Sequence, residues 1–219
     1  MQCFRGKKIS VRSLTLKQPA NSQGAEKGLR TMDLTERFKD ALTFTFDLHR
    51  AQRRKGTETP YLGHLLTVAG IVFDYGGSED EAIAALLHDA VEDQGGSETL
   101  EEIRRRFGEN VAGIVDGCSD TDQHPKPPWR GRKEEYLDHL PHADPSVILV
   151  SAADKLHNLR SFVKDYRVQG EALWGCFKGG REGTLWYHRE LIKAYRRVCD
   201  LPLIDEVERE LAELERIIE

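Results

Sequence analysis

The stretch ALLHDAVEDQ, residues 85–94, combines the apolar spacing of a buried helix with four titratable side chains. Residues four apart lie on the same side of a helix, so His88 would lie beside Glu92, and Asp89 beside Asp93. The apolar residues between them indicate that part of this face points inward. Burying several carboxylates costs free energy because each loses its hydration, and a metal cation would offset that cost.

A second stretch, SAADKLHNLRS at residues 151–161, repeats the pattern. Asp154 and Asn158 are four residues apart, and Ser161 follows one turn later. A single charged residue on a helix is more often solvent-exposed than functional. Taken one at a time, the charged residues of these two stretches would therefore be expected at the surface. Two polar stripes within apolar helices favour a shared, partly buried site.

Helical periodicity and capping residues predict a mostly helical chain. Ser78 and Glu81 form a capping box at the start of the helix that carries residues 85–94. Other helices are expected at about 33–55, 61–73, 99–107, 130–140, 145–165, 184–199 and 203–218. The three prolines between 117 and 130 predict a loop, and no strand-like alternation persists. We therefore predict an all-α fold, a single-domain helical bundle.

The first 31 residues differ from the remainder in charge. They contain seven Lys and Arg residues against one acid, Glu26, and lack a sustained apolar period. We expect residues 1–31 to be a disordered N-terminal tail and residues 32–219 to form the folded domain. A transit peptide would share this composition, as would upstream sequence preceding a true start at Met32.

Charge and composition argue against several classes of partner. The formal net charge of −5 gives no general basic field for nucleic acid. The longest apolar runs, such as VILV at 147–150, are far shorter than the roughly 20 residues of a membrane span. The four cysteines lie far apart without a C-x-x-C pair, which favours reduced thiols in a cytoplasmic protein and no thiolate-bound zinc.

Four blocks together resemble a known family. They are TPYLGHLLTVAGIV, ALLHDAVEDQ, LEEIRRRFGENVAGIVDGCSD and VILVSAADKLHNLRS, which occur in this order between about Phe44 and Ser161. They are similar to the hydrolase domain of RelA/SpoT-type alarmone enzymes, including the small alarmone hydrolases, a branch of the HD phosphohydrolases. The resemblance implies a single HD-domain helical bundle.

The resemblance also implies one divalent metal, usually manganese. Its ligands would be His64, His88, Asp89 and Asp154. Two imidazoles and two carboxylates are nitrogen and oxygen donors that suit manganese, iron or zinc, so the metal's identity rests on the family. His49 is an alternative first ligand, but His64 follows the PY pair of the family block and is preferred.

Further roles follow from the same resemblance. Glu92 and Asp93 would position or deprotonate the attacking water. Residues matching the nucleotide-binding positions are Arg54, Lys55, Asn158 and Ser161. A small-molecule nucleotide is therefore the expected partner.

The expected reaction is removal of the 3′-pyrophosphate of guanosine 3′,5′-bis(diphosphate), or its pentaphosphate form, to give GDP or GTP and pyrophosphate. One alternative is an HD phosphohydrolase acting on another nucleotide, such as an adenosine alarmone, the 2′-phosphate of NADPH or a nucleoside monophosphate. The other is a non-catalytic nucleotide-binding module. Beyond Ser161 no block matches, and there we hypothesise that Tyr187, with Trp129, Arg132 and Lys133, closes over the nucleotide.

Overall fold

The computed structural model describes residues 33–121, 123 and 125–219. Within them the α-helices are α1 (Glu36–His49), α2 (Leu62–Asp74), α3 (Glu79–Leu87), α4 (Ala90–Gln94), α5 (Gly96–Phe107), α6 (Glu109–Cys118), α7 (Trp129–His139), α8 (Pro145–Gln169), α9 (Gly180–Val198) and α10 (Pro202–Ile218). Two 3₁₀ segments, Leu140–His142 and Gly170–Cys176, flank α8. Among these residues only an isolated bridge, Arg53 to Pro60, has strand pairing. The all-α prediction is confirmed, whereas the predicted tail, 1–31, lies outside the described residues.

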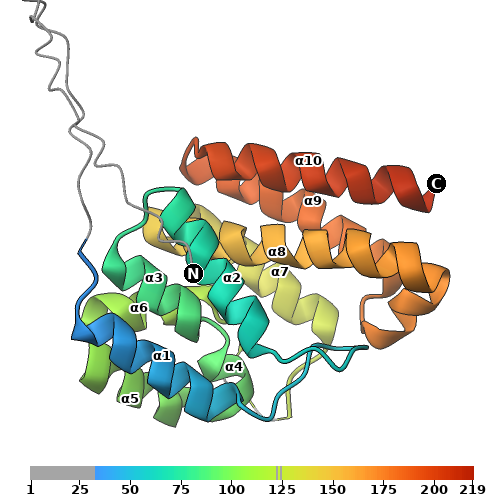
Figure 1. Ribbon diagram of the computed structural model, residues 1–219. Coiled ribbons are helices and arrows are strands. Elements are labelled where there is room, and N and C mark those ends of the chain that lie inside the picture. The colour runs from blue at the N-terminus through green and yellow to red at the C-terminus, as the bar shows by residue number, and fades with distance from the viewer. Residues whose placement is uncertain (1–32, 122, 124) are drawn as a thin grey trace, which may run out of the picture. The chain divides into compact units, whose positions relative to one another are not determined.

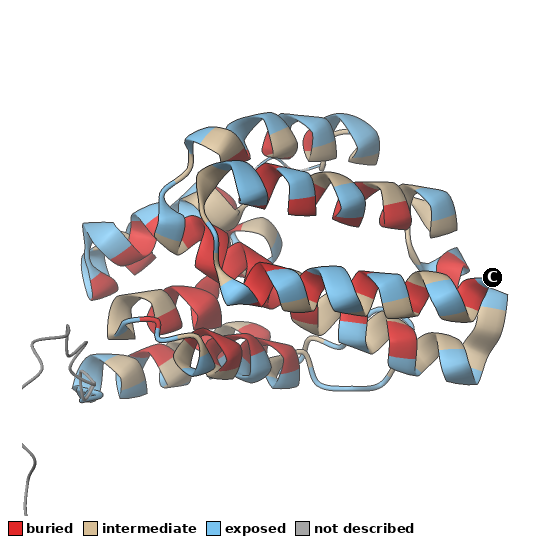
Figure 2. Ribbon diagram, turned by 90° about the horizontal axis from the view of Figure 1, so that it is seen from above, coloured by how far each residue is buried: buried red, intermediate tan, exposed pale blue. Residues whose placement is uncertain are grey.

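Helix α8 packs against other helices on two sides. It runs between α9 and α10 on one side and α2, α3 and α6 on the other (Figure 1). Buried residues concentrate where the helices face one another (Figure 2). In the described part of the chain, no helix combines the length and apolar character needed to cross a bilayer.

The contact between α10 and α8 follows directly from sequence periodicity. From Ile204 onward the buried residues of α10 recur at intervals of three or four; the buried set is Leu203, Ile204, Val207, Leu211, Leu214 and Ile218. Such spacing places an apolar stripe on one face of the helix. Removing these side chains from water favours packing by roughly 1.5–3 kcal/mol for each fully buried one.

Local capping fixes where several helices begin. Ser78 Oγ accepts a hydrogen bond from the backbone N–H of Glu81, and the Ser78 N–H donates to the Glu81 carboxylate, so the predicted capping box is confirmed. The long helix α8 begins with Asp144, whose side chain accepts from the Ser146 N–H, followed by Pro145 at the first helical position. Proline suits that position because no backbone donor is needed there.

The helix expected to run through residues 85–94 is interrupted. Helix α3 ends at Leu87, His88 and Asp89 form a turn, and α4 begins at Ala90. Two side chains bind backbone carbonyls that would otherwise accept the next hydrogen bonds of the helix. His88 Nδ1 donates to Ala85 O at 2.8 Å, and Thr45 Oγ1 donates to Leu86 O at 3.4 Å. Side-chain competition for backbone acceptors therefore ends the helix inside the motif.

Helix α6, which periodicity did not predict, packs closely on the start of α8 through Gly117. A methyl group at Gly117 would lie 2.7 Å from Val147 Cγ2, well inside van der Waals contact. At Gly113, one turn earlier on the same helix, the equivalent position has no atom within 4 Å.

We predict that Gly117→Ala lowers the free energy of unfolding by about 1–3 kcal/mol, because overpacking must displace Val147. Gly113→Ala, the matched control, should raise it by about 0.5–1 kcal/mol, because alanine favours the helix and meets no neighbour. Urea unfolding followed by circular dichroism measures both. Equal shifts for the two variants would show that the α6–α8 contact does not restrict residue size at position 117.

Candidate metal centre and nucleotide cavity

Three buried side chains from three helices converge on one point. His64 lies on α2, His88 immediately follows α3, and Asp154 lies in the middle of α8. Their ligand atoms all lie within 4.8 Å of one another, and among the described residues this is the one group of three or more such side chains that could hold a metal ion. His64, His88 and Asp154 are only 2%, 3% and 5% exposed.

The nitrogens that face this point lack hydrogen-bond partners. His64 Nε2 lies 3.2 Å from Asp154 Oδ1, and His88 Nε2 lies 3.7 Å from the same oxygen, yet both nitrogens are buried without an aligned hydrogen bond. Unsatisfied buried polar atoms cost free energy and require an explanation. Two imidazole nitrogens and a carboxylate form the donor set of a divalent metal centre, so these residues fit a cation.

The opposite ring nitrogens hold both imidazoles in position. His88 Nδ1 donates to the carbonyl of Ala85 at 2.8 Å. Nδ1 of His64 lies 2.6 Å from Nδ1 of His157, a distance at which one nitrogen donates and the other accepts. Burial and the neighbouring His64 and Arg54 lower the pKa of His157 to about 4, which leaves it neutral and able to accept. Hydrogen bonds of this kind orient metal-binding histidines.

Asp89 lies beside the group of three. Its Oδ2 is 3.0 Å from His88 Nε2 and 3.7 Å from His64 Nε2, and it accepts a hydrogen bond from the Tyr61 hydroxyl at 2.5 Å. The structure thus brings together all four residues predicted as metal ligands, with Asp89 at the edge.

The charges of the centre are strongly interdependent. Burial opposes ionisation of Asp154, but Lys155 and the buried imidazoles outweigh it and hold the pKa of Asp154 well below its usual range. Burial likewise opposes protonation of His88, yet the carboxylates of Asp89 and Asp154 raise its pKa well above the ordinary value. A cation bound here would take the place of that proton.

The two predicted water-handling carboxylates lie on the short helix α4. Lys126 Nζ contacts both of them, at 2.9 Å from Glu92 Oε1 and 3.0 Å from Asp93 Oδ1. Gln52 donates a further hydrogen bond to Asp93 at 2.9 Å. Burial and the nearby Asp120 carboxylate raise the pKa of Glu92, which moves it toward the range of a general base.

A cavity of about 580 Å³ opens beside these carboxylates and contains the predicted nucleotide-binding residues. Its lining includes Arg54, Lys55, Asn158 and Ser161, together with Asp89, Glu92, Asp93 and Asp154. Arg54 donates to Asn158 Oδ1 at 2.9 Å, and Asn158 donates to Asp154 Oδ1 at 2.5 Å. This chain of hydrogen bonds links the basic loop after α1 to the metal centre.

The residues suggested to close over the nucleotide divide into two pairs. Tyr187 and Lys133 line the cavity, with Lys133 Nζ 4.9 Å from the Tyr187 ring centroid. Trp129 instead contacts Gly179 and Gly183, where a methyl group would lie 2.8 Å and 3.1 Å from its ring. Arg132 also lies outside the lining.

The position of Arg132 explains its different role. Its guanidinium is buried against Asp120, at 2.5 Å from Oδ1, and Lys133 reaches the other oxygen of the same carboxylate. This pair connects the start of α7 to the segment that follows α6. We hypothesised from the sequence that Arg132 helps to close over the nucleotide, but in the structure it forms a buried ion pair with Asp120.

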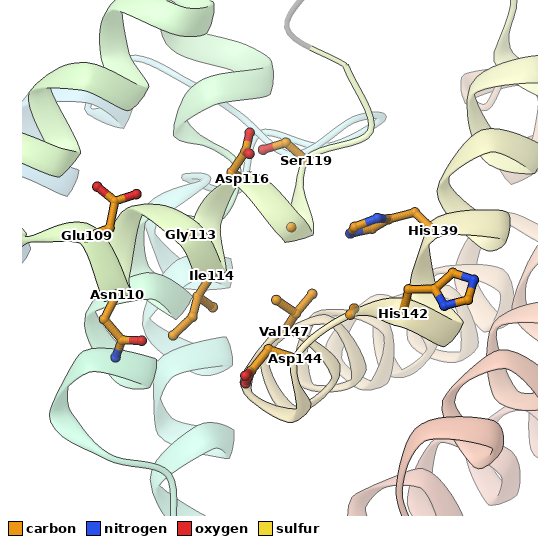
Figure 3. A pocket seen from close by; sticks show the side chains of 12 residues that line it. Glu109, Asn110, Gly113, Ile114, Asp116, Ser119, His139, His142, Asp144 and Val147 are labelled. Carbon is orange, nitrogen blue, oxygen red and sulfur yellow. The ribbon is translucent and has the colours of Figure 1, made fainter.

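Three other histidines are not among the converging ligands. His49 is buried and hydrogen-bonds through Nδ1 to Gln52 Oε1 at 2.6 Å, so it supports the Gln52–Asp93 contact, in agreement with a structural role. His139 and His142 line a separate hollow of about 750 Å³. Figure 3 shows Glu109 and Asp116, both on α6, among the residues that line this hollow. Among the described residues that line this hollow, no group of ligand atoms converges as it does at the metal centre.

Sequence reasoning did not predict four residues that contact the proposed ligands or the carboxylates of α4. They are Tyr61, Lys126, His157 and Gln52. Lys126 lies in a proline-rich loop where periodicity carries no information about contacts. His157 is three residues after Asp154 and shares its helix face, a spacing that could have indicated it.

Comparison with known proteins identifies the family of the chain. A sequence profile described as an HD domain matches residues 41–185. The guanosine-3′,5′-bis(diphosphate) 3′-pyrophosphohydrolase MESH1 of Homo sapiens is 36% identical over 170 residues, covering 73% of this chain and 90% of the human protein. The enzyme of the same name from Xenopus tropicalis is 44% identical over 124 residues, covering 55% of this chain and 66% of the frog protein.

Solved structures extend the similarity to three dimensions. A structure described as "A metazoan ortholog of SpoT hydrolyzes ppGpp and plays a role in starvation responses" superposes with a TM-score of 0.70 at 26% identity, covering 86% of this chain and 100% of that one. A Listeria monocytogenes protein gives a TM-score of 0.60 at 29% identity, covering 71% and 98%. The resemblance read from the four sequence blocks is confirmed, and the chain belongs to the HD domain family.

Proposed function

We propose that the chain is a metal-dependent hydrolase that removes the 3′-pyrophosphate of guanosine 3′,5′-bis(diphosphate), and of its pentaphosphate form. The observation that carries this proposal is the pair of unpartnered imidazole nitrogens beside Asp154, next to a cavity lined by basic residues. The names of the similar MESH1 proteins supply the substrate.

The proposed ligands are His64, His88, Asp89 and Asp154, with Mn²⁺ as the metal and iron or zinc as alternatives. When bound, a divalent cation lowers the pKa of water and offsets negative charge on the substrate. Glu92 and Asp93 lie at the cavity wall, where they orient the attacking water and accept its proton.

The reaction balances without further reactants. The water oxygen bonds to the phosphorus attached to the ribose O3′, and the bond between that phosphorus and O3′ breaks. The O3′ atom takes up a proton, and GDP and pyrophosphate are released. Arg54 and Lys55 bind phosphate oxygens, because guanidinium and ammonium groups pair well with them, while Asn158 and Ser161 hold the nucleoside.

Two alternatives are weaker. Another phosphorylated nucleotide would use the same metal centre, because specificity depends on cavity shape and its polar contacts. A non-catalytic nucleotide-binding module would not need Glu92 and Asp93 beside the centre. We also propose a cytoplasmic location, in keeping with Cys118, Cys176 and Cys199 being free thiols.

Turnover is the decisive experiment. Purified protein, stripped of metal and reloaded with Mn²⁺, is incubated with guanosine 3′,5′-bis(diphosphate), and products are separated by anion exchange. We expect GDP and pyrophosphate in equal amounts, only with added metal. A panel with adenosine 3′,5′-bis(diphosphate), NADPH and nucleoside monophosphates runs in parallel, and turnover of one of these alone would replace the proposed substrate.

Asp154→Asn should remove metal and activity together, because the carboxylate supplies charge and a ligand atom to the centre. We expect bound metal to fall below one-tenth of the wild-type content and turnover by at least a thousandfold. Elemental analysis and the product assay measure the two quantities. Asp138→Asn, an exposed position outside the cavity, serves as the control. Normal metal content in Asp154→Asn would refute its assignment as a ligand.

Lys126→Met should move the pH profile. Its ammonium lowers the pKa of Glu92 against the larger effects of burial and Asp120, so its removal raises that pKa further. Glu92 must be ionised to accept a proton, and the acid limb of kcat/KM should therefore shift to higher pH. Lys193→Met, at an exposed lysine paired with Glu190, is the control. An unchanged acid limb in Lys126→Met would show that Glu92 is not the proton acceptor.

A further inference from the structure

One end of the cavity is aromatic and rich in acceptors. Phe162 and Phe177 line it with ring centroids 5.0 Å apart and planes at 84°. Asp165 lines the same cavity and lies eleven residues after Asp154 on α8, roughly 16 Å along the helix axis. The metal centre and Asp165 therefore occupy different parts of the cavity.

The carboxylate of Asp165 has a weak ion-pair partner. Its side chain is 20% exposed, and its ion-pair partner is the neighbouring Lys164 at 3.3 Å, whose side chain is 68% exposed. A pair with such an exposed lysine contributes little free energy. The cavity is also lined by three cations of the loop after α1, which are Arg53, Arg54 and Lys55. Of these, Arg54 donates a hydrogen bond to Asn158.

His188 adds a second acceptor at the Phe162 ring. Its ring lies 5.9 Å from that ring, and its Nδ1 donates to the carbonyl of Thr184 at 2.8 Å. Its Nε2 is buried without a hydrogen-bond partner. Burial lowers the pKa of His188 to about 4, so the ring is neutral and Nε2 can only accept.

These acceptors match one purine better than the other. Guanine carries two donors on its Watson–Crick edge, the N1–H and the 2-amino group, and a carboxylate can accept from both. Adenine places an unprotonated N1 on the same edge, which repels a carboxylate. Aromatic side chains stack on either base, so they contribute binding without selection.

We propose that Asp165 is the residue that selects guanine, by accepting hydrogen bonds from the edge of a base stacked near Phe162 and Phe177. His188 Nε2 is a further acceptor beside the Phe162 ring. The inference rests on the proposed function, because it names the base-specific contact of the same cavity. It concerns a side chain outside the four sequence blocks that carry the family resemblance.

The test compares 3′,5′-bis(diphosphates) of guanosine, inosine and adenosine. Inosine keeps N1–H and lacks the 2-amino group, so wild-type kcat/KM should fall in the order guanosine, inosine, adenosine. In Asp165→Asn the amide offers one donor and one acceptor, the pattern that adenine complements. The preference for guanosine over adenosine should fall roughly ten- to hundredfold. Asp47→Asn, an exposed residue of α1, makes the same chemical change away from the cavity and should keep the wild-type preference.

The possible results separate the two proposals. Wild-type preference that persists in Asp165→Asn overturns the inference, as does a wild-type enzyme that does not discriminate, while the proposed reaction stands in both cases. Without turnover of any substrate the proposed function fails, and calorimetric binding of GDP and ADP to wild type and Asp165→Asn still tests the residue. His188→Phe preserves ring packing and should lower guanosine preference less than Asp165→Asn does; a larger loss would assign the selection to His188.

Discussion

Two imidazole nitrogens, His64 Nε2 and His88 Nε2, are buried beside carboxylate oxygens to which neither is hydrogen-bonded. Such an arrangement is costly in a protein interior unless a cation completes it. The surrounding helices hold it in place: α2, α3 and α8 pack directly on one another, and each supplies or adjoins one of the converging side chains. Apolar packing thus stabilises a polar cluster that could not persist alone.

The interruption between α3 and α4 determines how this centre meets the cavity. Because His88 bonds back to Ala85, its Nε2 faces His64 and Asp154, while the chain turns before Glu92 and Asp93. The carboxylates of α4 then meet Lys126 and Gln52. The turn therefore separates the proposed metal ligands from the carboxylates proposed to handle water within six residues.

From the family resemblance, sequence reasoning predicted the side chains that converge, and from local spacing it predicted most of the helices but not α6. It missed the interruption at His88, since that depends on Thr45, a residue 41 positions from the carbonyl it binds. Lys126 was missed because a proline-rich loop has no period from which to infer contacts. Arg132 looked like a cavity residue by composition, but the carboxylate of Asp120 binds it in the interior.

The centre has a consequence for how the chain reaches its final state. His64 and Asp154 are 90 positions apart, so the three ligand atoms come together only after a long loop has closed and α8 has docked. A cation that binds this assembled state, and not the unfolded chain, would stabilise the native population by mass action. Thermal denaturation of the protein would then depend on the free metal concentration of its surroundings, and metal scarcity would limit the lifetime of the protein as well as its activity.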